Sequence, residues 1–356
     1  MRNKISILFY VILFCISFCI QTKAEKLFDV LVNDGTTPTK SFVLVDTITD
    51  KSRIIEVNLK GDVIWAAEFS GPSEETNICR GADIEYIQER DSFRILIPYT
   101  SIIEANREGR IMILNRDSGI SHDFDTLSNG NILYARGWAN KGDNEFVEIS
   151  PNGDVIFSWN GSEHISDEQW AQNAKIGNWP TRWNRRLKVT EKGKDWLHIN
   201  SVEKLNDGFY LISSPNINSI LKISKSGDIV EWIGGANIVH DPVQLNGSII
   251  FSEKFPNEEK SDLIERITIL KPSGEKSFLL EGRLRAVRGI TVLEDGWLNI
   301  VSSGQILEIN LDGKIRYKAK IAIQSLTDEE NLYPYKRQKT LCGSGMGTLY
   351  KVAVLQ

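Results

Sequence analysis

The sequence has 356 residues, a formal net charge of −5 and 41% hydrophobic residues. This length allows two ordinary domains or one large repeat fold. A mildly acidic chain has no electrostatic basis for binding nucleic acid or anionic lipid, so both classes of partner are excluded.

Residues 1–24 have the pattern of a secretory signal peptide. Arg2 and Lys4 precede an uncharged apolar stretch, and a short polar segment with a small residue at its end follows. Cleavage there removes Arg2, Lys4 and Lys23 but no acid, so the charge falls from −5 to −8. The signal-peptide pattern predicts a periplasmic or secreted protein that is no longer attached to the membrane after cleavage. An uncleaved N-terminal anchor is the alternative.

Two cysteines, Cys79 and Cys342, remain after such cleavage. In an oxidising compartment they form one disulfide or stay as two buried thiols, and the sequence leaves both options open. No group of histidines and cysteines has the spacing of a metal site. We therefore expect neither a metal nor another cofactor.

One phrase recurs along the chain: an alternating strand, a turn with glycine, and a second strand. The turn glycines are Gly61, Gly109, Gly153, Gly227, Gly274 and Gly313. Their spacings are 48, 44, 74, 47 and 39 residues, and all but one match the period of a four-stranded propeller blade. Asn-Gly, Ser-Gly and Asp-Gly turns between such strands are typical of β-hairpins.

A second turn motif, leucine followed two or three residues later by glycine, lies upstream of several of these turns. Its glycines are Gly130, Gly208, Gly247 and Gly296. Two hairpins per repeat make four strands, and a β-sandwich would not repeat two turns in phase. Residues 25–356 are therefore predicted to form a single all-β domain, a six-bladed β-propeller. The strand at 347–354 is expected to pair with the N-terminal strand near 27–32 and close the ring.

The longest gap holds an insertion, about residues 160–195. Ser166 and Gln169 form a capping box that predicts a short helix. Four of the nine tryptophans fall in this insertion or directly after it: Trp170, Trp179, Trp183 and Trp196. An insertion over the mouth of the ring would let them hold an aryl group, whereas one on a blade edge would use them for packing.

Three of the four histidines occupy similar places in the repeats. His122 and His240 lie five residues before the leucine of the second motif, and so do Asn200 and Arg288, whereas His198 lies seven before. Because the first strand of each blade lines the centre of a propeller, these side chains are predicted to converge at one mouth. Hydrogen bonds between neighbouring blades are the alternative role for such histidines.

Several phrases resemble the arylsulfotransferase family, from about residue 56 to 310. The segment from Asp195 through His198 to Ser201 carries the most specific match, and further matches begin at His122, Ile212, Ile229 and His240. The resemblance implies a six-bladed periplasmic propeller that transfers a sulfuryl group between phenols without a nucleotide donor. It also implies that a histidine carries the group transiently.

The resemblance assigns His240 as the nucleophile and His122 and His198 as residues that polarise the sulfate and move protons. Asn200 is a further candidate for substrate binding. The family has an arginine after the Ile-Ser-Ser phrase, where this chain has Pro215. Arg288 or Arg136 from another blade would have to replace it.

The function predicted from the sequence is thus sulfuryl transfer from an aryl sulfate to a phenol, on a small aromatic or sulfated substrate. The alternative is a non-catalytic propeller that binds an anionic or aromatic ligand or a protein partner.

Overall fold

The computed structural model describes residues 25–46, 53–69, 82–174, 193–256, 263–284, 286–302, 304–322 and 351–356. The predicted leader, residues 1–24, and both Cys79 and Cys342 lie outside these ranges. Within the described ranges, no helix has the length and apolar composition to cross a membrane.

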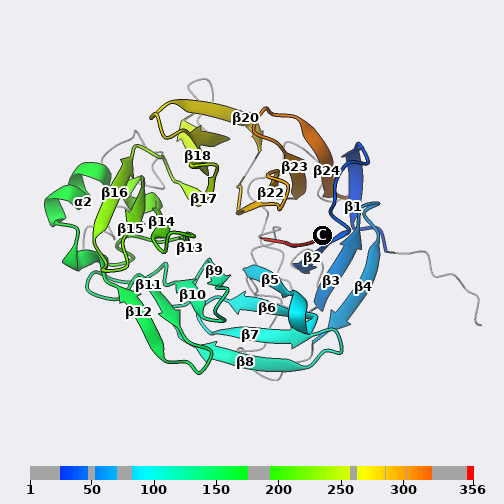
Figure 1. The fold of residues 1–356 in the computed structure, drawn as a ribbon, viewed down its shortest axis with the longest axis horizontal. Helices are drawn as coiled ribbons and strands as arrows, with labels where there is room; N and C mark the ends of the chain where they lie inside the picture. The colour runs from blue at the N-terminus through cyan, green and yellow to red at the C-terminus, as the bar shows by residue number, and fades with distance from the viewer. Residues whose placement is uncertain are drawn as a thin grey trace, which may run out of the picture.

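Six antiparallel sheets follow one another around a ring, and each sheet is one blade (Figure 1). The predicted six-bladed β-propeller is confirmed. Each blade begins with a strand near the axis of the ring and ends with a strand at its outer rim.

Blade 1 consists of β25 (Ala353–Leu355), β2 (Ser41–Val45), β3 (Arg53–Asn58) and β4 (Val63–Glu68). Blade 2 consists of β5 (Asp83–Ile87), β6 (Ser92–Ile97), β7 (Ser101–Asn106) and β8 (Ile111–Arg116). Blade 3 consists of β9 (Phe124–Thr126), β10 (Ile132–Ala135), β11 (Phe146–Ile149) and β12 (Val155–Trp159).

Blade 4 consists of β13 (Ser201–Lys204), β14 (Tyr210–Ser214), β15 (Ser219–Ile223) and β16 (Ile229–Gly234). Blade 5 consists of β17 (His240–Leu245), β18 (Ser248–Pro256), β19 (Leu263–Leu270) and β20 (Lys276–Leu284). Blade 6 consists of β21 (Gly289–Val292), β22 (Leu298–Ser302), β23 (Gln305–Ile309), β24 (Ile315–Ile321) and β1 (Phe28–Asn33).

The repeated glycines occupy the turns for which their conformation is needed. All six glycines of the first motif lie between the third and fourth strands of a blade with φ between 82° and 94°. The four glycines of the second motif lie between the first and second strands with φ between 76° and 84°. Because residues with a Cβ rarely adopt this region, these glycines fix the hairpins and hence the register of each blade.

The ring is closed differently from the sequence prediction. We expected the C-terminal strand to pair with the N-terminal one, and this prediction was wrong. Strand β25 pairs with β2 as the inner strand of blade 1, whereas β1 pairs with β24 as the outer strand of blade 6. Blade 1 receives only three strands from the N-terminal part of the chain, so its inner edge is covered by β25.

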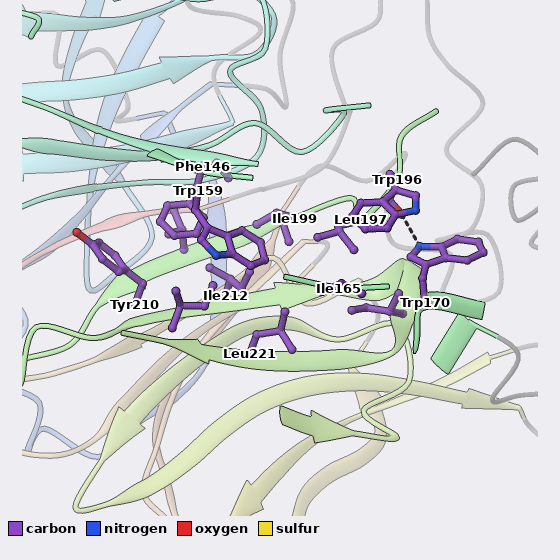
Figure 2. Close-up of a cluster of buried hydrophobic side chains, with 14 of the residues drawn as sticks. Phe146, Trp159, Ile165, Trp170, Trp196, Leu197, Ile199, Tyr210, Ile212 and Leu221 are labelled. Atoms are coloured by element: carbon purple, nitrogen blue, oxygen red, sulfur yellow. Dashed lines mark hydrogen bonds between the residues drawn. The ribbon is translucent and has the colours of Figure 1, made fainter. Parts of the chain in front are cut away.

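The hydrophobic core lies between the blades. Six apolar clusters each join two neighbouring blades around the whole ring. Strand β6 is buried at every position because blades cover both of its faces, whereas the rim strand β4 alternates between exposed and half-buried positions. Figure 2 shows the cluster between blades 3 and 4, with Phe146, Trp159 and Tyr210 packed together.

The insertion contains the predicted helix, α2 (Asp167–Ala174), at the outer rim of the ring (Figure 1). Its capping box is confirmed: the Ser166 N–H donates to Gln169 Oε1 (2.9 Å), and the Gln169 N–H donates to Ser166 Oγ (3.1 Å). Short 3-10 turns lie at η3 (Gln88–Arg90), η4 (Gly161–Glu163) and η5 (Pro215–Ile217).

Candidate functional site

The predicted site residues lie at the starts of the inner strands of neighbouring blades. Arg288 directly precedes β21, and His240 opens β17. His122 lies two residues before β9, and His198 lies three residues before β13. All three imidazoles are mostly buried, at 7% exposure each. A shared hairpin register places equivalent positions of successive blades at the same end of their inner strands.

His240 has a defined tautomer. Its Nδ1 lies 2.9 Å from the carbonyl oxygen of Ile238, which only accepts, so Nδ1 carries the proton. Its Nε2 accepts a hydrogen bond from the guanidinium of Arg288 at 2.7 Å. Burial, followed by the charges of Arg288 and Lys254, holds the pKa of His240 well below its usual value. The imidazole is therefore neutral, with its lone pair on Nε2.

The backbone around His240 is strained and tied to blade 4. Ile238 and Asp241, on either side, have φ values of 43° and 44°, in the left-handed region. Asn200 holds this segment, because its Nδ2 donates to the Val239 carbonyl at 3.0 Å and its Oδ1 accepts from Ser213. Strained backbone held by neighbouring groups is concentrated at functional sites.

His122 and His198 lie together beside an aromatic pair. Their ring centroids are 5.3 Å apart, and Trp138 lies 4.4 Å from His122 and 5.6 Å from His198. Tyr99 stacks on Trp138 at 4.4 Å and is 49% exposed. Nδ1 of His198 lies 2.7 Å from Oδ1 of Asp195, an arrangement that orients the imidazole.

Gly137 allows Trp138 to approach the histidines. A Cβ on Gly137 would lie 2.4 Å from both the Ile199 carbonyl oxygen and Ser121 Oγ. The Gly137 N–H donates to that same Ser121 hydroxyl at 2.6 Å. Only a glycine fits where blades 3 and 4 come this close, and the next residue is thereby set against His122.

A buried group of acids lies next to the histidines around Lys351, just before β25. The Lys351 ammonium contacts Asp123, lies 3.3 Å from Asp83 and lies 3.7 Å from Asp241. Asp123 and Asp241 directly follow His122 and His240 in the chain. Burial, together with the other carboxylates, raises the pKa of Asp83 to about 7 and that of Asp241 to about 8, against the lowering effect of Lys351.

The described residues hold no group of three or more His, Cys, Asp or Glu side chains arranged to bind a metal. The chemistry available at this site is that of a neutral imidazole beside cations and two further imidazoles.

The family comparison covers most of this part of the chain. The sequence model of the family described as arylsulfotransferase (ASST) matches residues 29–241, which is more than half of the chain and includes all three histidines of the site. The chain belongs to the arylsulfotransferase family. No curated protein matches the sequence significantly.

Comparison with solved structures finds similarities at low sequence identity. A protein of unknown function from Bacteroides caccae is 11% identical with a TM-score of 0.54, covering 89% of this chain and 100% of its own. A streptogramin B lyase is 14% identical with a TM-score of 0.49, covering 83% and 88%. An inactive virginiamycin B lyase from Staphylococcus aureus with quinupristin is 16% identical with a TM-score of 0.47, covering 84% and 89%. The likeness to the Bacteroides caccae protein describes the fold alone and not an activity.

The two arginines considered as replacements for the family arginine have different surroundings. Arg288 contacts His240, whereas Arg136 pairs with Asp117 at 2.9 Å and donates to the Asn144 carbonyl at 3.2 Å. Pro215 is buried and begins η5. Of the two candidates to replace the family arginine, the structure thus brings Arg288 to His240 and engages Arg136 in an ion pair.

The tryptophans of the insertion that the structure describes belong to the core. Trp170 and Trp196 are 6% and 2% exposed, and the Trp170 indole donates to the Trp196 carbonyl at 3.1 Å (Figure 2). They pack between blades 3 and 4. Trp179 and Trp183 lie outside the described residues.

Sequence reasoning missed the aromatic pair, Tyr99 and Trp138, and the cation Lys351. Tyr99 and Trp138 follow strands in turns that carry no repeated motif, so no periodicity marks them. Lys351 precedes the strand whose partner was predicted wrongly. The Asp195–x–x–His198 spacing was visible in the sequence and would have predicted their contact.

Proposed function

We propose that this protein transfers a sulfuryl group from an aryl sulfate to a phenol and that His240 carries the group between them. The observation that supports this most directly is the state of His240. It is a neutral imidazole whose lone-pair nitrogen faces the cation of Arg288. A nucleophile of this kind, next to a fixed positive charge, suits attack on an anionic ester.

In the first step, Nε2 of His240 attacks the ester sulfur. The N–S bond forms while the S–O bond to the aryl group breaks, and the electron pair leaves with the phenolate. Arg288 releases Nε2 and binds the sulfuryl oxygens. The Nδ1–H remains on the Ile238 carbonyl, which keeps the ring in place as it gains positive charge.

His198 supplies the proton to the leaving phenolate. Its contact with Asp195 stabilises the protonated ring, and His122 lies against it. In the second step the same imidazole takes a proton from the acceptor phenol, whose oxygen attacks the sulfur. The N–S bond then breaks, and neutral His240 is restored.

The aryl rings of donor and acceptor pack on Trp138 and Tyr99. Trp138 lies directly beside the imidazoles of His122 and His198, and Tyr99, stacked on Trp138, is exposed enough to meet a substrate. The backbone of Tyr99 is held at φ 66°, an uncommon conformation for a non-glycine residue. An offset ring stack of this kind contributes about 0.5–1.5 kcal/mol beyond the area it buries.

Mass spectrometry after exposure to an aryl sulfate tests the proposal. We expect one added SO₃ group on the peptide with His240, together with release of the phenol. His240→Ala should abolish both, while His164→Ala, in the turn after η4, should keep both. If a folded protein shows no adduct and releases no phenol, transfer is refuted. That result would favour a propeller that only binds its ligand.

Export through residues 1–24 stays a prediction.

A further inference from the structure

A buried lysine next to His240 has no ionic partner among the described residues. Lys254, on β18, is only 9% exposed. Within the described part of the chain, it has no hydrogen bond from its ammonium group and no carboxylate within 4.0 Å. Glu265 lies directly across from it on β19, but that carboxylate accepts from the Val287 N–H at 2.8 Å. Lysines this deeply buried are rarely left without a counter-ion.

The sheet register places Lys254 on the same side as His240. His240 pairs with Ser252 across β17 and β18, and Lys254 is two residues further along β18. Because alternate residues of a strand share a face, Lys254 is the diagonal neighbour of His240, at a typical separation of about 7–8 Å between Cα atoms. The Lys254 N–H donates to the Asn237 carbonyl at 2.8 Å, which keeps its backbone next to the segment leading to His240.

The position corresponds to that of Pro215 in the neighbouring blade. Leu205 pairs with Phe209 across the first hairpin of blade 4, and Leu245 pairs with Ser248 across that of blade 5. Ser213 and Ser252 each lie four residues further along the second strand and so occupy equivalent places. Two residues beyond these serines the chain has Pro215 in blade 4 and Lys254 in blade 5. Where blade 4 lacks a cation, blade 5 supplies one at the equivalent place.

We propose that Lys254 and Arg288 together form the site for the sulfuryl oxygens, one from each side of His240. The ligand class is a sulfate monoester anion, with inorganic sulfate as its smallest member. Arg288 approaches from blade 6 and Lys254 from the second strand of blade 5. The lowering of the His240 pKa by both charges agrees with this placement. The inference rests on the proposed function but assigns the binding of the anion separately from its transfer.

Sulfate binding by the purified protein tests the inference without turnover. The chain has only four histidines, so the imidazole ¹⁵N resonance of His240 can be followed by NMR during titration with sodium sulfate. We expect Lys254→Met and Lys254→Gln to weaken sulfate binding at least tenfold and Lys254→Arg to retain it within threefold. The pKa of His240 should rise in the first two variants, because a cation beside it is lost.

Lys204→Met is the matched control. Lys204 is half-buried and pairs with Glu148 between blades 3 and 4 at 2.6 Å, so its replacement removes a lysine contact between blades elsewhere in the ring. It should leave the sulfate affinity unchanged.

Turnover of an aryl sulfate gives the second measurement. Lys254→Met should lower kcat/KM about 100-fold, with Lys254→Arg within tenfold of the wild type. Sulfate affinity unchanged in both folded variants, Lys254→Met and Lys254→Gln, would overturn the inference. Binding that depends on Lys254 in a protein without turnover would support it and refute the proposed transfer instead.

Discussion

The guanidinium of Arg288 lies 2.7 Å from Nε2 of His240, although the two residues belong to different blades. The contact gives this chain a cation at the histidine even though Pro215 stands where the family resemblance places an arginine. Arg288, which directly precedes the inner strand of blade 6, thus donates to His240, which opens the inner strand of blade 5.

Replacement of Arg288 tests this contact. Arg288→Met should lower kcat about 10²–10³-fold, because one preorganised charged donor is lost from the transition state. Arg136→Met should lose less than tenfold, since that guanidinium is bound to Asp117. The pKa of His240, followed by NMR, should rise in Arg288→Met because a neighbouring positive charge is removed. Equal kinetic losses in the two variants would contradict the assignment.

The aromatic pair should govern substrate affinity more than the chemical step. Trp138→Leu should raise KM for aryl sulfates about tenfold and change kcat less, since stacking is similar in ground and transition states. Tyr99→Leu should have the same direction of effect. The change in KM is measured with aryl sulfate donors of one ring and of two rings. A KM that stays unchanged in both variants for every donor would exclude the pair from the binding site.

Asp195 should matter most for donors with poor leaving groups. Asp195→Asn weakens the partner of His198, so protonation of the leaving phenolate should slow by about 10²–10⁴-fold for phenols of high pKa. Donors whose phenol has a pKa near 7 need little protonation and should lose less than tenfold. A plot of log kcat against leaving-group pKa checks this, and a uniform loss across all donors would argue against acid catalysis by His198.

The raised pKa of the Asp241 carboxyl predicts that the stability of the protein depends on pH. Its pKa is about 8 in the folded protein and about 4 when unfolded, so between pH 4 and 8 the folded state holds a proton that the unfolded chain has released. The stabilisation is complete below pH 4 and is lost as pH rises through 8. Asp241→Asn should therefore reduce the fall in unfolding free energy between pH 5 and 8, measured by urea titration. A slope identical to that of the wild type would disprove the prediction.

Two turn glycines form a matched pair for stability. Gly61 and Gly153 have φ of 84° and 87°, but a Cβ at Gly61 would lie 2.0 Å from the Phe28 carbonyl oxygen, whereas one at Gly153 meets nothing within 4 Å. Gly153→Ala should cost about 1 kcal/mol and Gly61→Ala about 3 kcal/mol or more, because only the second adds a backbone clash. Similar losses in the unfolding free energy would show that strand β1 yields at this point.

The architecture was predictable because it depends on local signals. Each turn glycine sets a hairpin by its own conformation, so the phase of the repeats also placed His122 and His240 at equivalent points of their blades. The capping box of Ser166 and Gln169 is likewise complete within four residues. Contacts of this kind do not depend on any distant part of the chain.

The remaining features depend on which distant segments meet. Both terminal strands were visible in the sequence, but it does not show which of the open edges each one covers. The contact of Trp138 with His122 requires the close approach of blades 3 and 4 at Gly137, and that approach exists only in the closed ring. For the same reason, the convergence of Lys351 on acids from three blades follows no periodic pattern.

The closure of blade 1 by β25 has a consequence for the order of folding. During synthesis from the N-terminus, β2, β3 and β4 emerge among the first strands, yet their inner edge stays open until every other blade has been made. An open strand edge can pair with another chain, so the growing protein passes through a long interval in which aggregation competes with closure. The same late strand delivers Lys351, so the acids beside the histidines gain this cation only when the ring is complete.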